Sequence, residues 1–246
     1  MYKDVAIALC AALFSVSACN SQKKALSATQ INTLTRHEQN NGWKLLFDGK
    51  TTKGWHTYNR DTVSKNWKVI DGTLVANPKE KTTREMEDIV TNNQYENYEL
   101  ALEWRISEGG NSGIIFNIKE DPKFTNTYNT GLEMQILDNI KASDNKKETH
   151  LAGLLYDISG TAAMSKPKPV GEWNAARIIQ KNGRLTFYFN GVKTFDGRHE
   201  SEEWKNMIAN SKFKTWENFA LSPKGKIAFQ DHGHEVAFRN IKIKQL

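Results

Sequence analysis

Residues 99–106 read Glu-Leu-Ala-Leu-Glu-Trp-Arg-Ile, with an apolar side chain at every second position from Leu100 onward. A period of two places alternate side chains on opposite faces of a β-strand, so residues 98–106 are predicted to form a strand with one buried face. Further strand candidates are residues 113–118, 132–137, 176–180, 226–230 and 236–243. Short strands at regular spacing, without helical patterns between them, indicate an antiparallel sandwich or barrel.

Two turn dipeptides mark hairpins. Asp71-Gly72 separates the strand candidates 67–70 and 73–75, and Asn190-Gly191 separates 185–189 and 192–195. Asp-Gly and Asn-Gly favour a type I′ turn, whose two central residues both need positive φ angles. Two short helices are also expected: one within residues 26–39, capped by Ser27 or Thr29, and one over residues 201–210, capped by Ser201.

The composition indicates one folded domain and excludes several classes of protein. The chain has 246 residues, and 34 basic against 28 acidic residues give a net charge of +6. The basic residues are interspersed with acidic ones, and no long basic tract is present to follow a phosphate backbone, so a nucleic-acid partner is not expected. Two cysteines are too few for a disulfide scaffold.

The amino terminus has the features of an export signal. Residues 5–16 form an apolar run that is too short to span a membrane and has the length of a signal-peptide core. The run leads into Ser17-Ala18-Cys19, which resembles the lipobox of bacterial lipoproteins. We therefore predict a lipoprotein signal peptide over residues 1–18 and a lipid on Cys19. The alternative is a plain secretory signal cut near Ala18.

Three regions follow from this prediction. Residues 1–18 are the signal peptide, residues 19–41 are a lipid-anchored tether with a short helix, and residues 42–246 are a single catalytic domain. The protein is expected to be exported and to contact the membrane only through its anchor. The residues after Cys19 are not acidic, which favours a periplasm-facing position.

Polar side chains occupy the outward positions of several predicted strands. The set is Glu103, Arg105, Asn117, Glu133, Gln135 and Gln230. These are hydrogen-bonding types suited to hydroxyl-rich ligands, so a polar, concave sheet face that binds sugar is one interpretation. The other interpretation is an ordinary hydrated face on which Glu133 pairs with Arg105.

Chemistry-bearing residues also gather in two loops. Residues 230–235 contain His232 and His234 with two carboxylates, a spacing that is only a weak metal motif. The loop over residues 139–149 is expected to fold over the sheet face. Its folding would bring together Glu133, Gln135, Asp138, His150, Tyr156 and Asp157. The motifs of serine hydrolases, nicotinamide enzymes, P-loop NTPases and zincins do not occur.

Six blocks of sequence resemble one known family. They are residues 42–50 (GWKLLFDGK), 110–116 (GNSGIIF), 131–138 (GLEMQILD), 171–174 (GEWN), 225–233 (GKIAFQDHG) and 238–242 (FRNIK). In this order they resemble the 3-keto-glycoside 1,2-lyase and 3-keto-2-hydroxy-glucal hydratase family, formerly called the 3-keto-disaccharide hydrolase domain. The resemblance implies a concanavalin A-like jelly-roll sandwich of two antiparallel sheets with short peripheral helices.

The resemblance also implies a reaction. A ketone at C3 of the sugar acidifies the C2 proton, so a base can remove it and the C1 aglycone leaves by β-elimination; hydration of the resulting glucal can follow. The candidate base is His150 or Glu133, and Tyr156 is the candidate proton donor. His232, Arg105 or a bound divalent cation would stabilise the enolate. A glycoside 3-dehydrogenase is the implied pathway partner.

The blocks and the polar face together predict seven substrate-binding residues. They are Glu103, Arg105, Asn117, Gln135, Asp138, Gln230 and Trp173.

Two further functions stay open at this point. Residues 133–138 resemble the catalytic run of family 16 glycoside hydrolases, in which Glu133 and Asp138 would form the carboxyl pair. A retaining hydrolase needs those groups about 5 Å apart, and an offset of five residues achieves this only with a bulge. A non-catalytic glycan-binding module would instead use aromatic platforms such as Trp55, Tyr128 or Trp173.

Overall fold

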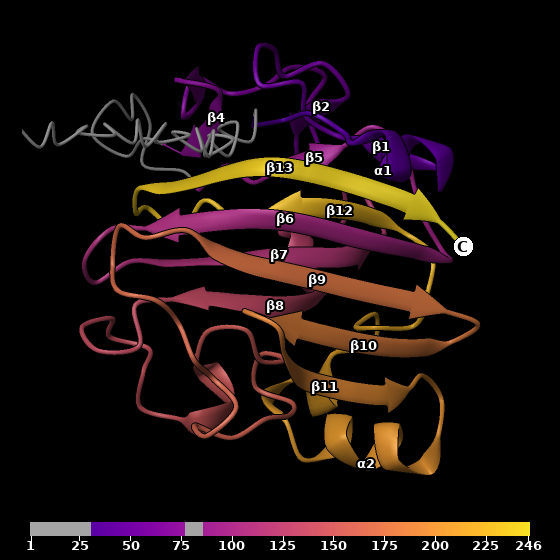
Figure 1. Ribbon diagram of the computed structural model, residues 1–246. Helices are drawn as coiled ribbons and strands as arrows, with labels where there is room; N and C mark the ends of the chain where they lie inside the picture. The colour runs from indigo at the N-terminus through magenta and orange to yellow at the C-terminus, as the bar shows by residue number, and fades with distance from the viewer. Residues whose placement is uncertain (1–30, 77–85) are drawn as a thin grey trace, which may run out of the picture. The chain divides into compact units, whose positions relative to one another are not determined.

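Two antiparallel β-sheets form the body of the protein in the computed structural model, which describes residues 31–76 and 86–246 (Figure 1). The predicted jelly-roll sandwich with short peripheral helices is confirmed. The signal peptide, the lipidation at Cys19 and the suggested caps Ser27 and Thr29 lie outside the described residues. Within the described ranges, no helix has the length and apolar character needed to cross a membrane.

Most described elements are strands. The helices are α1 (Arg36–Asn40), η2 (Thr127–Asn129), η3 (Glu148–His150), α2 (Glu202–Ala209) and η4 (Lys212–Thr215). The strands are β1 (Trp43–Leu45), β2 (Trp55–Thr57), β3 (Trp67–Ile70), β4 (Thr73–Ala76), β5 (Ile89–Thr91), β6 (Tyr98–Ile106), β7 (Asn111–Ile118), β8 (Leu132–Leu137), β9 (Asn174–Lys181), β10 (Arg184–Phe189), β11 (Val192–Arg198), β12 (Lys226–Phe229) and β13 (Val236–Gln245).

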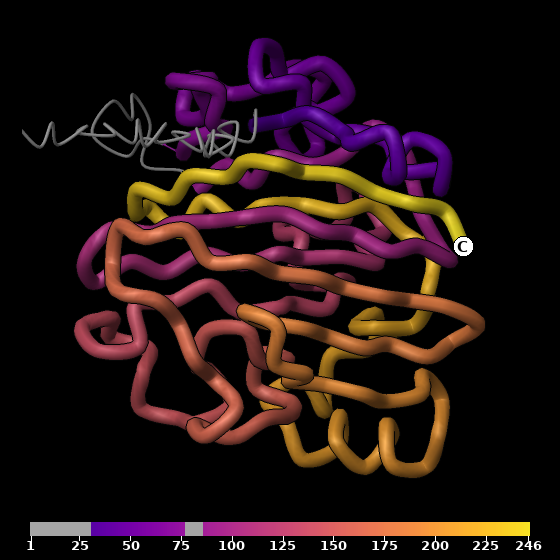
Figure 2. The backbone as a smooth tube through the Cα atoms, viewed as in Figure 1, coloured from indigo at the N-terminus to yellow at the C-terminus, as the bar shows by residue number. Residues whose placement is uncertain are grey.

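The strand order joins distant parts of the sequence. The larger sheet has the order β11-β10-β9-β6-β13-β4-β3, with β1 also paired to β13, and the smaller sheet has the order β2-β5-β12-β7-β8. Figure 2 shows the yellow C-terminal strand beside a purple strand from the first half of the chain; this is the pairing of β13 with β6. The smaller sheet carries the candidate site.

Aromatic side chains join the two sheets in the core. Phe229 of β12 stacks on Phe238 of β13 with ring centroids 4.1 Å apart, and Phe116 of β7 meets Phe187 of β10 edge-on at 5.7 Å. All four side chains are fully buried. Contacts between large aromatic rings contribute strongly to a sandwich core, because each ring removes a large apolar area from water.

The predicted hairpins are confirmed. Asp71 and Gly72 have φ angles of 47° and 73°, and Asn190 and Gly191 have 47° and 81°. These positive angles are those that a type I′ turn needs. Strands β1, β2 and β5 were not predicted, because each has only three residues and so too few positions for alternation to be recognised.

The two helices differ in how well their starts were predicted. Helix α2 begins directly after Ser201, whose side chain accepts a hydrogen bond from the backbone of Trp204. Helix α1 begins later than expected, after Thr35. There the Thr35 hydroxyl and the Glu38 carboxylate cap each other's backbone N–H groups. This reciprocal capping fixes the start of the helix.

Helix α1 belongs to the domain itself. The compact unit runs from Ile31 to Leu246, so it begins before the predicted boundary at residue 42. Asn32 and Asn240 hydrogen-bond through both side-chain oxygens to each other's backbone N–H, at 2.6 and 2.8 Å. Lys242 also forms an ion pair with Glu38 of α1. These contacts tie the start of the described chain to β13.

Candidate active site

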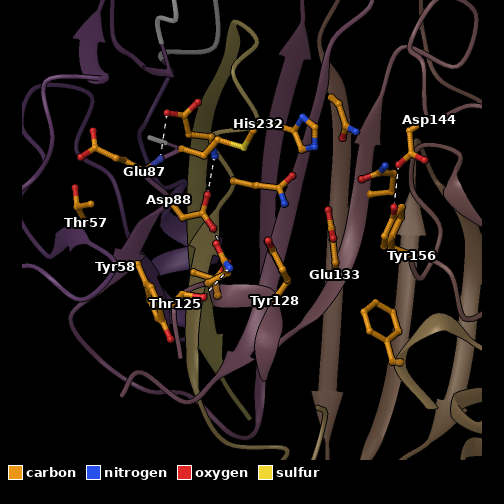
Figure 3. Close-up of a pocket in the computed structure, with 18 of the residues that line it drawn as sticks. Thr57, Tyr58, Glu87, Asp88, Thr125, Tyr128, Glu133, Asp144, Tyr156 and His232 are labelled. Atoms are coloured by element: carbon orange, nitrogen blue, oxygen red, sulfur yellow. Dashed lines mark hydrogen bonds between the residues drawn. The ribbon is translucent and has the colours of Figure 1, made fainter. Parts of the chain in front are cut away.

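A polar pocket of about 660 Å³ lies on the outer face of the smaller sheet (Figure 3). Its volume falls within the range typical of small-molecule sites. Its wall comes from strands β2, β7 and β8, the residues flanking β5 and β12, and the loops that contain η2, Asp144, Tyr156 and η4. The lining residues are Thr57, Tyr58, Arg60, Met86, Glu87, Asp88, Asn111, Thr125, Asn126, Thr127, Tyr128, Glu133, Gln135, Asp144, Tyr156, Lys212, Phe213, Gln230, Asp231 and His232.

Glu133 lies in the middle of this wall. Figure 3 shows its carboxyl group between Tyr128 and Tyr156. The residue is buried, and no hydrogen bond to its carboxyl group comes from the residues that the structure describes. Burial raises the pKa of Glu133 to about 8; the positive charge of Lys212 opposes this, while Asp88 and Asp144 add to it. A carboxyl group that titrates near neutral pH and has no fixed partner is suited to accepting a proton.

Gly113 makes room for that carboxyl group. Strand β7 places Gly113 opposite Gln135 of β8, two residues from the pairing of Ile115 with Glu133. A Cβ added at Gly113 would lie 2.1 Å from Oε1 of Glu133 and 2.7 Å from its carboxyl carbon. The glycine therefore lets Glu133 lie flat across the neighbouring strand.

Gly113→Ala is expected to displace the Glu133 side chain without unfolding the sheet, because the backbone at Gly113 needs no positive φ angle. A misplaced catalytic group commonly costs 10- to 100-fold in rate, so we expect a fall in kcat of about that size. Steady-state kinetics on the 3-keto-glycosides that the family resemblance implies measures it, and near-ultraviolet circular dichroism checks the fold. Unchanged kcat in a folded Gly113→Ala variant would show that the placement of Glu133 does not matter.

A chain of hydrogen bonds leads away from the pocket behind Tyr156. The Tyr156 hydroxyl donates to Oδ2 of Asp144 at 2.9 Å (Figure 3), and Oδ1 of Asp144 lies 2.7 Å from Nδ1 of His150. Nε2 of His150 lies 2.8 Å from Asp157, which also pairs with Lys147. Both imidazole contacts are hydrogen bonds only if the His150 ring is doubly protonated or one acid carries a proton. The chain can thus hold an exchangeable proton behind Tyr156.

Tyr156 keeps its own proton under ordinary conditions. Burial first, and then the hydrogen bond to Asp144 and its charge, raise the pKa of Tyr156 well above its usual value. His150 contacts the same ring at a tilt of 35°, with centroids 4.4 Å apart, but it does not itself line the pocket. His150 is therefore connected to the pocket through its contacts with Asp144 and Tyr156.

Two further polar side chains of the pocket have unsatisfied atoms. Gln135 is 1% exposed, and its Oε1 has no hydrogen-bond partner among the described residues. Nδ1 of His232 is likewise buried without a partner there. Burial, with a smaller contribution from His234, lowers the pKa of His232, which favours the neutral imidazole. A hydroxyl-rich ligand would supply the missing partners for both side chains.

The opposite wall is a network of acids. Glu87 pairs with Arg60 at 2.8 Å, and Asp88 accepts a hydrogen bond from the Thr127 hydroxyl at 2.5 Å and from the backbone N–H of Asp231 at 2.9 Å. These carboxylates hold the residues around β5 and β12 together. This wall is therefore held by contacts within the protein.

Comparison with known proteins identifies the family. The sequence profile of the 3-keto-alpha-glucoside-1,2-lyase-like domain matches residues 42–244. The chain belongs to this family.

A related sequence and two solved structures match this chain over most of its length. The chain is 31% identical to a 3-keto-disaccharide hydrolase of Bacteroides thetaiotaomicron over 92% of its own length and 86% of that protein. A candidate glycosyl hydrolase structure from Parabacteroides distasonis superposes with a TM-score of 0.80 at 32% identity, over 88% of this chain and all of that one. A second structure from the same organism gives 0.59 at 28% identity, over 84% of this chain and all of that one.

The structure brings together five of the residues expected from the family resemblance. Glu133, Gln135, Tyr156, Gln230 and His232 line one pocket, and His150 stands directly behind it. The loop over residues 139–149 contributes Asp144 to the wall, in line with the expectation that it covers the sheet face.

Glu103, Arg105 and Trp173 do not belong to this pocket. Glu103 and Arg105 lie on β6 of the larger sheet, so the expectation that they share a face with Glu133 is corrected. The Trp173 ring contacts two guanidinium groups, that of Arg239 at 4.1 Å and that of Arg105 at 5.0 Å from the ring centre. Glu103 pairs with Arg239 at 2.6 Å. An alternation of period two identifies the face of a strand but not the sheet to which the strand belongs.

Asn117 and Asp138 are also outside the pocket and have structural contacts instead. Asn117 donates to the side chain of Gln180 at 2.7 Å, which links β7 to β9. Asp138 accepts from the backbone N–H groups of Gly109 at 2.8 Å and Ile140 at 2.9 Å. Because its carboxylate is occupied by these donors, Asp138 is not the partner of Glu133 that a family 16-like hydrolase would need.

The aromatic platforms expected of a glycan-binding module are mostly absent from the pocket. Trp55 is a core residue: it stacks on Phe229 at 5.1 Å and donates to the backbone of Leu46. Of the three suggested aromatic platforms, only Tyr128 lines the pocket. In the described ranges, no group of three or more His, Cys, Asp or Glu residues is arranged to hold a metal ion.

Sequence reasoning missed several pocket residues, and these are mostly in loops. They are Thr57, Tyr58, Arg60, Glu87, Asp88, Asp144, Lys212 and Asp231. Asp231 could have been predicted, because it belongs to the acid- and histidine-rich segment 230–235. Lys212 could not, since a lysine at the start of a 3-10 helix has no sequence pattern that indicates a site.

Proposed function

We propose that this protein cleaves 3-keto-glycosides by β-elimination and hydrates the resulting 3-keto-2-hydroxy-glucal. The observation that carries the proposal is Glu133: a buried carboxyl group, without a hydrogen-bond partner in the described chain, whose pKa is raised to about 8 inside a polar pocket. Such a group is a stronger base than an exposed carboxylate, and a carbon acid beside a ketone needs a strong base. Family membership supports the same substrate class.

The reaction needs no redox step. Glu133 takes the C2 proton, and the electrons of the C2–H bond form an enolate with the negative charge on the C3 oxygen. The enolate re-forms its ketone as the C1–O bond breaks, and the departing oxygen takes a proton. Tyr156 is the proton donor in this proposal, and it regains a proton from Asp144, which is hydrogen-bonded to His150.

Hydration runs through the same groups in the opposite sense. Water takes the place of the aglycone oxygen at C1 and gives a proton to Tyr156, whose own hydroxyl proton passes to Asp144. Glu133 returns its proton to C2. Gln135 and His232, with their unsatisfied polar atoms, would hold sugar hydroxyls during both half-reactions. The summed outcome is hydrolysis of the glycosidic bond of a 3-keto sugar.

The substrate must first be oxidised at C3. A glycoside 3-dehydrogenase is therefore the upstream partner that this proposal requires. We also propose that both reactions take place outside the cytoplasm, on the basis of the signal-peptide pattern and Cys19 in the sequence.

Matched chromogenic substrates test the proposal. The purified protein is incubated with 4-nitrophenyl α- and β-glucosides and with their 3-keto forms, with and without a chelator, and release of nitrophenol is followed. We expect release from a 3-keto substrate and none from the ordinary glucosides. Release from the ordinary glucosides would instead favour a conventional hydrolase, and release from no substrate would favour a glycan-binding module.

A further inference from the structure

Lys212 places an amino group on the wall of the pocket. Its backbone N–H donates to Oδ2 of Asp157 at 2.6 Å, which fixes the start of η4. Its Nζ lies 4.1 Å from the centre of the Tyr156 ring. The residue is exposed to solvent, so a ligand in the pocket can reach the amino group.

The ammonium group of Lys212 has no ion-pair partner among the described residues, although acids surround it. The other cation of the pocket, Arg60, is paired with Glu87 at 2.8 Å. Partial loss of hydration lowers the pKa of Lys212, and the charges of Glu133, Asp157 and Asp144 oppose this effect. Lys212 is thus a cation that faces the pocket and is available to a ligand.

The positive charge of Lys212 also lowers the pKa of Glu133, the proposed base. The charged groups that act on Glu133 within the described chain are Lys212, Asp88 and Asp144, so Lys212 is the one cation among them. Enolate formation needs a base at C2 and a positive charge at the oxygen of the adjacent C3. The charges of Glu133 and Lys212 interact with each other. Such a pair meets this need, because the two reacting positions are on neighbouring carbon atoms.

We propose that Lys212 is a catalytic residue that donates a hydrogen bond from its ammonium group to the C3 ketone oxygen and stabilises the enolate. The inference rests on the proposed function, since an ordinary glycoside has no ketone at C3. It assigns to Lys212 the role that the sequence had suggested for His232, Arg105 or a divalent cation. Arg105 lies on the other sheet, and His232 favours its neutral form.

Three variants test the role of the charge. Lys212→Met is expected to lower kcat on the 3-keto substrate by about 10²- to 10³-fold, the usual cost of losing one group that stabilises an oxyanion, with a smaller change in KM. Lys212→Arg keeps the positive charge and is expected to retain a substantial part of kcat. Lys214→Met, an exposed lysine of the same 3-10 helix outside the pocket, is the matched control and should resemble the wild type.

The pH profile gives a readout that a merely structural role would not change. The charge of Lys212 lowers the pKa of Glu133, so its removal should move the acidic limb of kcat/KM to higher pH. We expect this shift in Lys212→Met and not in Lys212→Arg or Lys214→Met.

Proton exchange at C2 separates enolate formation from departure of the aglycone. The probe is 1,5-anhydro-3-ketoglucitol, which has the ketone but no aglycone, incubated with enzyme in D2O. Incorporation of deuterium at C2, followed by NMR, should slow in Lys212→Met by a factor similar to the loss in kcat. Reduction of enzyme and probe with borohydride should leave Lys212 unmodified.

The outcomes distinguish this inference from the proposed function. A wild-type enzyme that is active on 3-keto-glycosides, with Lys212→Met within about threefold of it, would overturn the role of Lys212 alone. A lysine adduct trapped by borohydride would also overturn it, because Lys212 would then act as a nucleophile. A wild-type enzyme that is inactive on every 3-keto-glycoside would overturn the proposed function and this inference together.

Discussion

Glu133→Gln is expected to lower kcat on 3-keto-glycosides by about 10³-fold, because an amide keeps the size of the side chain but accepts no proton from C2. The same variant should abolish deuterium exchange at C2 of 1,5-anhydro-3-ketoglucitol. Glu172→Gln, an exposed glutamate away from the pocket, is the control. If Glu133→Gln kept both activities, Glu133 would not be the base.

The wild-type pH profile follows from the same carboxyl group. Only ionised Glu133 accepts a proton, and its pKa is raised to about 8, so kcat/KM should rise with pH until about that value. An unperturbed glutamate would give a plateau from much lower pH. A profile that is already flat at pH 6 would show that the base is another group.

Stability gives an independent check on the burial of Glu133. The folded protein holds this proton up to about pH 8, whereas the ordinary pKa of a glutamate is 4.5. In that interval the folded state binds more protons than the unfolded state. The stability contributed by the neutral group is therefore fully present below about pH 4.5 and is lost as the pH rises towards 8. Glu133→Gln should remove this loss, so its Tm should exceed that of the wild type at pH 8 but not at pH 4.

Local patterns were enough to predict most of the strands. Alternation of period two gave β6 and β8 with their full extents, and the dipeptides at Asp71 and Asn190 gave two hairpins. Each of these features depends on neighbouring residues only. The pairing of β13 between β6 and β4 depends instead on contacts between residues far apart in sequence, which no local pattern contains.

The site was predicted only in part for the same reason. Glu133 and Gln135 are on β8 and Gln230 directly follows β12, where the alternation indicates which side chains face outward. Asp144 and Lys212 are in loops, whose positions are set by contacts such as the hydrogen bond from Lys212 to Asp157. The resemblance to a family marked the strands near Glu133, Gln135 and Gln230. Arg105 was taken instead from the alternation along β6, which does not show the sheet that a strand joins, and Trp173 precedes β9 and lies outside this pocket.

The proposed catalytic residues fall into two groups by the atom on which they would act. In the proposed reaction Glu133 and Lys212 act on C2 and on the C3 oxygen, whereas Tyr156 and Asp144 act on the oxygen at C1. Variants in one group should therefore leave the chemistry of the other group measurable. A loss confined to one half of the reaction then identifies the bond on which a residue acts.

Tyr156→Phe is expected to lower kcat by about 10²- to 10³-fold on 3-keto-glycosides with a sugar or alkyl aglycone, because such an oxygen leaves poorly without a proton. With 4-nitrophenol as the aglycone the loss should be less than about tenfold, since nitrophenolate departs without protonation. Exchange of the C2 proton in 1,5-anhydro-3-ketoglucitol should continue near the wild-type rate, because Glu133 is intact.

Variants behind Tyr156 complete the test. His150→Ala leaves the Tyr156 hydroxyl in place but removes the partner of Asp144 at 2.7 Å, so it should cause a smaller loss with the same dependence on the aglycone. Rates across a series of aglycones, from nitrophenol to methanol, measure this dependence for both variants. If Tyr156→Phe slowed all aglycones equally and also slowed C2 exchange, Tyr156 would act on the enolate rather than on the leaving oxygen. The hydrogen-bond chain through Asp144 would then position the sugar instead of supplying its proton.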